Sequence, residues 1–250
     1  AGVRRVVLTS SVGALGVPEG TTPATEDTPF DQFGRCAHYI LSKHFANLVG
    51  RAAQDEGRDV VIVYPAMPFG PGDHRPTPTG KSLLRVLGGA YFAVGAGGIN
   101  AVDVRDVARG HLLALERGAP GGRYLLSGHD LPMEDYFRLV RRLGGVQRRL
   151  VRVPPRALAA LGAVGDLVGR VAEPLIDSRT VRYTSQHLTY DCSRAEAELG
   201  YTRRPIEETF ADAIAWFRER GYPEPGIGLW DLTTRKRMTR AGARQGVADR

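Results

Sequence analysis

The sequence predicts an α/β fold in which parallel strands alternate with helices. Apolar runs at 3–11, 59–64 and 123–127 have the composition of strands buried in a parallel sheet. Residues 38–56 and 105–117 carry apolar side chains at helical spacing between these runs. Because a strand, a helix and a second strand in this order form a crossover unit, we expect a layered core with both helices packed against the sheet.

A smaller, mainly helical region follows from about residue 129. Helices are predicted at 132–143 and 155–171, and a final helix begins with Pro205 at its first position. The apolar stripe of 155–171 indicates a core or lid helix, because two charged residues interrupt a stretch that is too short for a membrane anchor. Residues 223–250 form a basic tail that we expect to be disordered.

Composition excludes several classes of function. With 250 residues and 42% apolar content, the chain can bury a substantial core. Most of the net charge of +7 lies in 228–250, and no basic patch interleaved with aromatic residues occurs, so we expect no nucleic-acid partner. Cys36 and Cys192 form no C-x-x-C pair, which argues against a metal site and for a reducing compartment. No signal peptide or long apolar run is present, so we expect a cytoplasmic protein without membrane contact.

The candidate catalytic residues are Tyr39 and Lys43. They lie four positions apart in the predicted helix, so they share one face, and an ammonium beside a phenol favours its ionised form. Taken alone, this spacing is often a chance pair on a solvated helix. Here it follows a strand that ends in Thr9-Ser10-Ser11, and open α/β folds bind ligands at the carboxyl ends of their strands. The combination predicts a Tyr that exchanges a proton with a bound substrate.

Two loops are candidates for ligand contact. Residues 65–80 contain five Pro and three Gly, and a long loop without secondary structure usually contacts a ligand. The alternative is a rigid connector. Residues 18–34 carry Glu26 and Asp27 towards the helix of Tyr39.

Other acidic and His residues have structural interpretations. Asp103 as the cap and Asp106 in the first turn of helix 105–117 favour a structural role over substrate contact. His38 and His44 lie six positions apart, on different faces of their helix. We therefore expect two solvated His side chains and no metal site.

Together these motifs resemble the extended short-chain dehydrogenase/reductase family, the NAD-dependent epimerase/dehydratases. In that family a strand-end Ser and a Y-x-x-x-K helix form the catalytic triad. The resemblance implies that Ser11, Tyr39 and Lys43 are catalytic, with Ser10 and Thr9 as alternatives to Ser11.

Further runs narrow this resemblance. V-D-V-R-D-V-A at 102–108 and D-C-S-R-A-E-A-E-L-G-Y at 191–201 are similar to two elements of the family. The runs at 9–16, 76–80 and 110–118 resemble the hopanoid-associated sugar epimerases, which are themselves similar to dihydroflavonol reductases.

The resemblance implies a Rossmann-like parallel sheet with a smaller C-terminal substrate-binding region. Residues 1–128 would be the C-terminal part of the dinucleotide-binding domain, 129–222 mainly the substrate-binding region and 223–250 the tail. The implied activity is that of an NAD(P)-dependent oxidoreductase, epimerase or dehydratase, with hydride transfer assisted by the Tyr, the Lys and the Ser. Its small-molecule substrate would be sugar-like, or a secondary alcohol or ketone. A homodimer through the helix of Tyr39 and Lys43 is also implied.

The implied cofactor is NAD or NADP, held at the nicotinamide half of its pocket. The start of loop 65–80 resembles the family's P-x-x-x-x-G-P element, whose backbone lies against the nicotinamide. The implied cofactor-binding residues are Ser10, Ser11, Tyr39, Lys43, Tyr64, Pro65, Ala66, Met67 and Pro68.

The 250 residues contain no Gly-rich strand-to-helix turn of the kind that binds a pyrophosphate. We therefore expect an N-terminally truncated sheet that lacks about 100 residues of βα units, and no adenine or pyrophosphate contacts. The alternative function is a non-catalytic or partner-complemented fragment that does not bind a dinucleotide by itself. Strands 3–11 and 59–64 would then lack the inner strands with which they normally pair, which would leave a long apolar edge open to a partner.

Overall fold

A computed structural model describes residues 2–18, 22–33, 38–89, 93–94, 97–147, 150–169, 178, 181, 189–222 and 224. Its first sheet has the strand order β1-β2-β6, with β1 at Val6–Thr9, β2 at Val60–Pro65 and β6 at Arg123–Leu126. Both pairings are parallel, as predicted.

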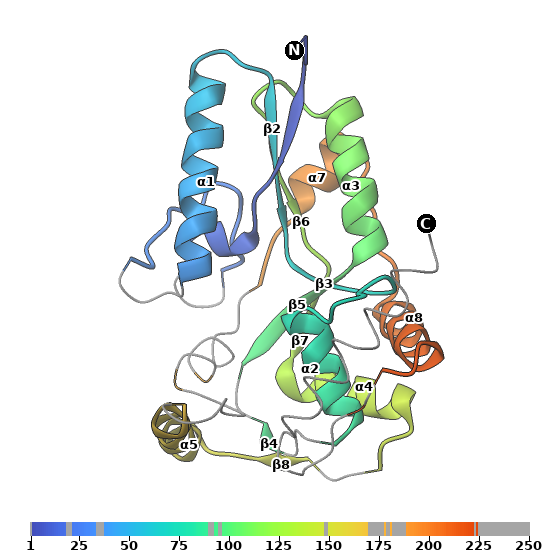
Figure 1. Ribbon diagram of the computed structural model, residues 1–250. Coiled ribbons are helices and arrows are strands. Elements are labelled where there is room, and N and C mark those ends of the chain that lie inside the picture. Colours follow the sequence, from blue (N-terminus) through green and yellow to red (C-terminus); the bar gives the residue numbers. More distant parts are fainter. Residues whose placement is uncertain are drawn as a thin grey trace.

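Two helices cover opposite faces of this first sheet. Helix α1 (His38–Asp55) lies on one face and α3 (Val104–Arg117) on the other (Figure 1). Gly50 allows α1 to approach β1 closely, because a Cβ atom there would lie 2.4 Å from Leu8 Cδ2. The predicted α/β layering is confirmed, and it places the first two turns of α1 beside the carboxyl end of β1 (Figure 1).

The second sheet has the order β3-β5-β7, with β3 at Met67–Phe69, β5 at Gly98–Asp103 and β7 at His129–Pro132. Strand β5 is parallel to β3 and antiparallel to β7. Three helices pack against this sheet: α2 (Pro78–Leu87), α4 (Met133–Gly144) and α8 (Ile206–Glu219).

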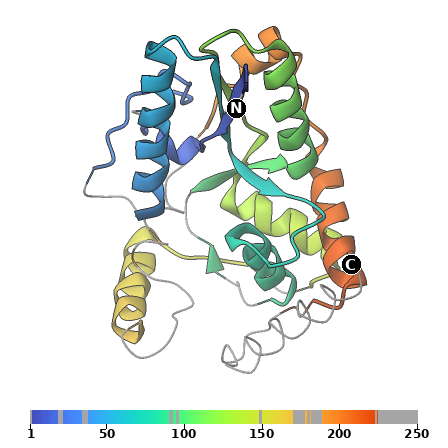
Figure 2. The same ribbon diagram turned by 45° about the horizontal axis from the view of Figure 1, so that its top comes forward.

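The remaining elements are short or peripheral. A 3-10 helix, η1 (Val12–Ala14), follows β1, and α7 (Ser193–Leu199) packs near β6. Strands β4 (Ala93–Val94) and β8 (Val151–Arg152) pair with each other. Helix α5 (Pro155–Val168) lies at the periphery, on the α1 side of the molecule, in both views (Figures 1 and 2).

The interpretation of 65–80 as a loop without secondary structure was wrong. Its first part forms β3, an edge strand, and an edge position tolerates Pro68 because the missing N–H is not needed for pairing. Its last part begins α2 at Pro78, after Thr77, whose side chain accepts a hydrogen bond from the Gly80 N–H. Pro205 likewise precedes its helix as the N-cap and does not take the first helical position.

Two hydrophobic cores interleave along the chain. One contains the first sheet with Cys192 to Tyr201, and the other joins 69–101 to α4 and α8. The predicted boundary at 128 stays a prediction, but neither core is contiguous in sequence. Of the predicted tail 223–250, the structure describes only Glu224. None of the helices in the described part of the chain has the length and apolar character that a membrane span requires.

Candidate active site

The carboxyl end of β1 carries three consecutive hydroxyl residues in different environments. The Ser10 N–H donates to Val63 O at 2.9 Å, which keeps this strand end in register with β2. The Ser10 side chain is only 3% exposed, and its Oγ has no hydrogen-bond partner among the described residues. Ser11 Oγ accepts from the Gly13 N–H at 3.2 Å and so caps η1. Ser10 Oγ is therefore a buried polar atom that the described part of the chain leaves unsatisfied.

Helix α1 brings Tyr39 and Lys43 to this strand end. Lys43 Nζ lies 3.4 Å from Thr9 O and 6.0 Å from the centroid of the Tyr39 ring. The Tyr39 side chain is 60% exposed. The structure thus brings Tyr39, Lys43 and Thr9 together, and Ser10 and Ser11 follow Thr9 directly.

His44 anchors the same part of α1. Its Nδ1 lies 3.3 Å from Ala14 O, and its ring stacks on Phe30 with the centroids 3.9 Å apart. The expectation of a solvated side chain was correct for His38 and wrong for His44, because the aromatic residues of the preceding loop bury it. Within the described ranges, no group of three His, Cys, Asp or Glu could hold a metal ion. Cys36 lies outside these ranges.

The predicted nicotinamide-side segment lies where β2 passes into β3. The Ala66 N–H donates to Leu126 O at 3.2 Å, Ala66 itself is buried, and Pro68 is exposed. The Tyr64 side chain points into the core, where its hydroxyl donates to Asn47 Oδ1 at 2.8 Å and burial raises its pKa. Only the backbone of Tyr64 therefore remains for a cofactor contact.

Glu26 and Asp27 do not lie at the helix of Tyr39, contrary to expectation. The buried Glu26 carboxylate accepts from the Leu125 N–H at 2.7 Å, and burial raises its pKa although this hydrogen bond acts in the opposite direction. Asp27 pairs with Arg123 and Arg194, each at 2.5 Å. Both acids thus cover β6, the edge opposite β1, where the backbone has no further strand to bind in the described part of the chain.

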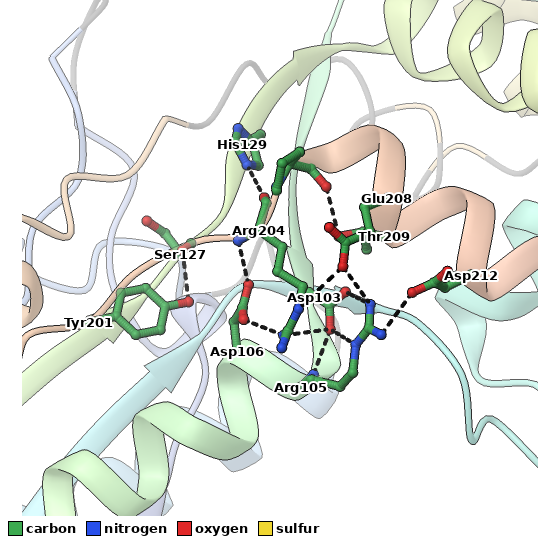
Figure 3. Close-up of polar contacts among 11 residues, drawn as sticks. Asp103, Arg105, Asp106, Ser127, His129, Tyr201, Arg204, Glu208, Thr209 and Asp212 are labelled. Carbon is green, nitrogen blue, oxygen red and sulfur yellow. Dashed lines mark hydrogen bonds and ion pairs between the residues drawn. The ribbon is translucent and has the colours of Figure 1, made fainter.

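Asp103 and Asp106 belong to a polar cluster that joins α3 to α8 (Figure 3). Asp103 caps α3 and accepts two hydrogen bonds from the Arg105 side chain, at 2.9 and 2.7 Å. Burial alone would raise the pKa of Asp103, but the hydrogen bonds from Arg105 hold it below its usual value. Asp106 accepts from the Arg204 N–H and guanidinium, and Arg105 also pairs with Asp212. This geometry supports the structural interpretation of both acids.

Sequence reasoning missed His111. This residue of α3 lies 2.8 Å from Thr9 Oγ1 through its Nε2 atom, on the face of the sheet opposite Lys43. The run at 110–118 contributed to the resemblance, but no spacing within it points to the strand 102 positions earlier.

The chain is similar in sequence to known proteins of one family. The model of the NAD dependent epimerase/dehydratase family matches residues 1–127. A protein of Synechocystis sp. described as a dihydroflavonol 4-reductase is 35% identical over 230 residues, which cover 89% of this chain and 66% of that protein. Sterol demethylase protein B of Methylococcus capsulatus is 34% identical, over 88% of this chain and 68% of that protein.

The fold comparison gives the same answer. A crystal structure of a nucleoside-diphosphate-sugar epimerase from Pseudomonas aeruginosa has a TM-score of 0.74 and 30% identity, over 88% of this chain and 68% of that one. The chain thus spans about two thirds of the length of the relatives that it matches. Its sheet, its Tyr and Lys helix and these matches together show that the chain belongs to the NAD-dependent epimerase/dehydratase family.

Proposed function

We propose that the chain supplies the proton-transfer and nicotinamide-side half of an NAD(P)-dependent oxidoreductase or epimerase. The observation that carries this proposal is the position of Lys43, whose Nζ lies beside the Tyr39 ring while it binds the backbone at the end of β1. A fixed ammonium at this place can donate hydrogen bonds to a ligand that lies beside the proton-transferring Tyr.

The residues of the strand end fit a dinucleotide and its substrate. Ser10 Oγ is buried without a partner among the described residues, and Lys43 Nζ has donors left after its bond to Thr9 O. These groups would hold the nicotinamide ribose, with the backbone of Pro65 to Pro68 beside the ring. A bound nicotinamide would supply the hydride exchange. Tyr39 would take the proton of the substrate hydroxyl, and Ser11 would donate a hydrogen bond to the same oxygen.

The names of the relatives support a secondary alcohol, ketone or sugar-like substrate. Curated relatives are named as reductases, and a structural relative at 30% identity is named as an epimerase of nucleoside-diphosphate sugars. These classes share one chemical step, the interconversion of a carbinol and a carbonyl group. The residues proposed here serve this step for either class.

The test combines titration and turnover. NADH and NADPH titrated into the 250-residue chain should bind in the millimolar range, because the chain has no pyrophosphate-binding turn. Absence of binding at millimolar cofactor would refute the proposal for this chain. A micromolar Kd would contradict the proposal that the chain holds only the nicotinamide side of the cofactor pocket. In a form that turns over, Tyr39→Phe should abolish kcat and leave cofactor binding nearly unchanged, whereas Lys43→Ala should weaken both.

A second candidate function is a partner-complemented fragment without activity of its own. Among the described residues β2 pairs on both sides, contrary to expectation, whereas β1 pairs only with β2. Val3, which precedes β1, and Val6, its first residue, are 70% and 47% exposed. An open edge of this kind recruits another strand. Light scattering distinguishes the two candidates: a monomer that unfolds sharply and binds cofactor supports the enzyme, whereas a chain that is stable only with a partner supports the fragment.

A further inference from the structure

Thr9 is held from both faces of the first sheet. From α1, Lys43 Nζ reaches the main-chain carbonyl of Thr9 at 3.4 Å, and from α3, His111 Nε2 lies 2.8 Å from its hydroxyl. Helices α1 and α3 lie on opposite sides of the strands (Figure 1). One residue at the end of β1 therefore joins the helix of the candidate catalytic pair to a helix that carries no predicted catalytic residue.

The tautomer of His111 follows from its second contact. Its Nδ1 lies 2.8 Å from the carbonyl oxygen of Val107, one turn earlier in α3. A carbonyl only accepts, so Nδ1 carries a proton, and in the ring with this one proton Nε2 is an acceptor. The Thr9 hydroxyl then donates to Nε2, and the orientation of the Thr9 side chain is defined by a ring that Val107 holds in place.

The direction of the Thr9–Ser10 peptide explains why this contact matters for Lys43. The Ser10 N–H points to Val63 O on β2, so the Thr9 carbonyl, on the opposite side of the same planar peptide, points to the free edge of β1. Lys43 reaches this carbonyl at the edge, where no neighbouring strand in the described part of the chain binds the carbonyl oxygen. The bond from the Ser10 N–H to Val63 O holds the peptide from the β2 side, and the contact with His111 holds the Thr9 side chain from the α3 face.

We propose that His111 is a positioning residue that acts through Thr9 on Lys43. It holds the strand end so that the Thr9 carbonyl fixes the ammonium beside Tyr39. The inference rests on the proposed function for its catalytic meaning, but the arrangement of Thr9, Lys43 and His111 is testable without turnover.

Two amide substitutions give a matched pair. His111→Gln places an amide oxygen near the position of Nε2 and can accept the Thr9 hydroxyl, whereas His111→Asn is one carbon shorter and reaches only the region of Nδ1. His111→Leu removes both contacts. Leu113→Ala is the control for general loosening of α3, because Leu113 is buried on the same helix and belongs to the core of the first sheet.

The first readout is the carbonyl ¹³C resonance of Thr9 in the labelled 250-residue chain. The charged donor polarises this carbonyl, so Lys43→Met should move the resonance upfield. His111→Leu and His111→Asn should move it in the same direction, His111→Gln should leave it near the wild-type position, and Leu113→Ala should leave it in place. Equal positions in wild type and in the Asn and Leu variants would overturn the proposal, as would a Leu113→Ala shift as large as theirs.

The second readout uses the assay in which Tyr39→Phe abolishes turnover. His111→Asn and Thr9→Val should each lower kcat about fivefold, the factor expected from one net hydrogen bond, with KM unchanged within about twofold. The double variant should be no slower than either single variant, and His111→Gln and Thr9→Ser should restore kcat. If Tyr39→Phe remains active, the proposed function fails; if Tyr39→Phe is inactive and the Asn and Val variants are unaffected, only the role of His111 fails.

Discussion

Two clusters of polar residues at the ends of strands differ in how completely their groups are paired. Around Asp103, at the end of β5, a helix cap, two Arg side chains and the acids of α8 satisfy one another (Figure 3). Around Thr9, at the end of β1, Ser10 Oγ is buried without a partner in the described part of the chain, and Tyr39 is largely exposed. Buried polar groups are normally satisfied, so the incompletely paired cluster is the better candidate for ligand binding.

The two clusters also differ in their position in the fold. The Asp103 cluster lies between α3 and α8, where the two hydrophobic cores meet. The Thr9 cluster lies on an edge strand whose outer side has no strand among the described residues. We therefore expect substitutions at the first cluster to change the free energy of unfolding, and substitutions at the second to change binding and turnover.

The largest expected effect on stability is that of Asp103→Ala. It removes the cap of α3 and two charged hydrogen bonds from Arg105, and should lower the free energy of unfolding by about 3 kcal/mol. Chemical denaturation measures the change. Asp59→Ala is the control, since it breaks the partly exposed pair of Asp59 with Arg5 beside β1 and should cost less than about 1 kcal/mol. Equal losses for the two variants would contradict the comparison.

Local patterns in the sequence predicted the parts of the molecule that depend on neighbouring residues. The apolar runs gave the parallel strands β1, β2 and β6, and the spacing of Tyr39 and Lys43 gave their shared face. The cap at Asp103 was likewise predicted from its place before a helix.

What the sequence did not predict depends on partners far away in the chain. Glu26 binds the Leu125 N–H across 99 positions, and Thr9 meets His111 across 102. No periodicity encodes such pairings. Strand β3 was missed for the same reason, because a segment of three residues that contains Pro68 becomes a strand only beside β5.

A smaller effect is expected on self-association. The homodimer through α1 that the family resemblance implies would bury Phe45 and Val49, which are 54% and 71% exposed in the single chain. Val49→Glu would place a charge in an apolar contact and should weaken dimerisation by about 2 kcal/mol, seen as a rise in the dimer Kd by sedimentation. Leu161→Glu, at an exposed apolar position on α5, is the matched control. An unchanged dimer Kd for Val49→Glu would mean that the dimer interface does not include this part of α1.

The pH dependence of Glu26 is expected to be smaller again. Burial raises its folded-state pKa, so the proton is held more tightly in the folded chain. Its stabilising contribution is therefore complete below the unfolded-state pKa and is lost as the pH rises through the folded-state pKa. Glu26→Gln keeps an acceptor for the Leu125 N–H and has no such proton. The stability of wild type relative to this variant should therefore fall as the pH rises from the unfolded-state pKa of a Glu carboxyl through the higher folded-state pKa of Glu26.

Asp103→Asn is the control of opposite sign. The hydrogen bonds from Arg105 hold the pKa of Asp103 below its usual value, so its contribution is present above the unfolded-state pKa and is lost as the pH falls through the folded-state pKa. Wild type should therefore lose stability relative to Asp103→Asn as the medium becomes more acidic. The measurement is the difference in free energy of unfolding between wild type and each variant, plotted against pH. If the plots for Glu26→Gln and Asp103→Asn have the same slope, the environments of Glu26 and Asp103 do not differ as the structure indicates.

The smallest expected effect on stability is that of Ser10→Ala. Because the buried hydroxyl has no partner among the described residues, its removal should leave the free energy of unfolding unchanged or raise it by up to about 1 kcal/mol. Ser11→Ala, one position later, removes the cap of η1 and should cost about 0.5 to 1 kcal/mol. Cofactor titration should show that Ser10→Ala weakens the binding of NADH or NADPH, although the variant is no less stable than wild type. A loss of more than about 1 kcal/mol of stability in Ser10→Ala would mean that the hydroxyl has a structural hydrogen-bond partner. The polar groups at the end of β1 would then be satisfied, as those of the Asp103 cluster are, and the difference between the two clusters would disappear.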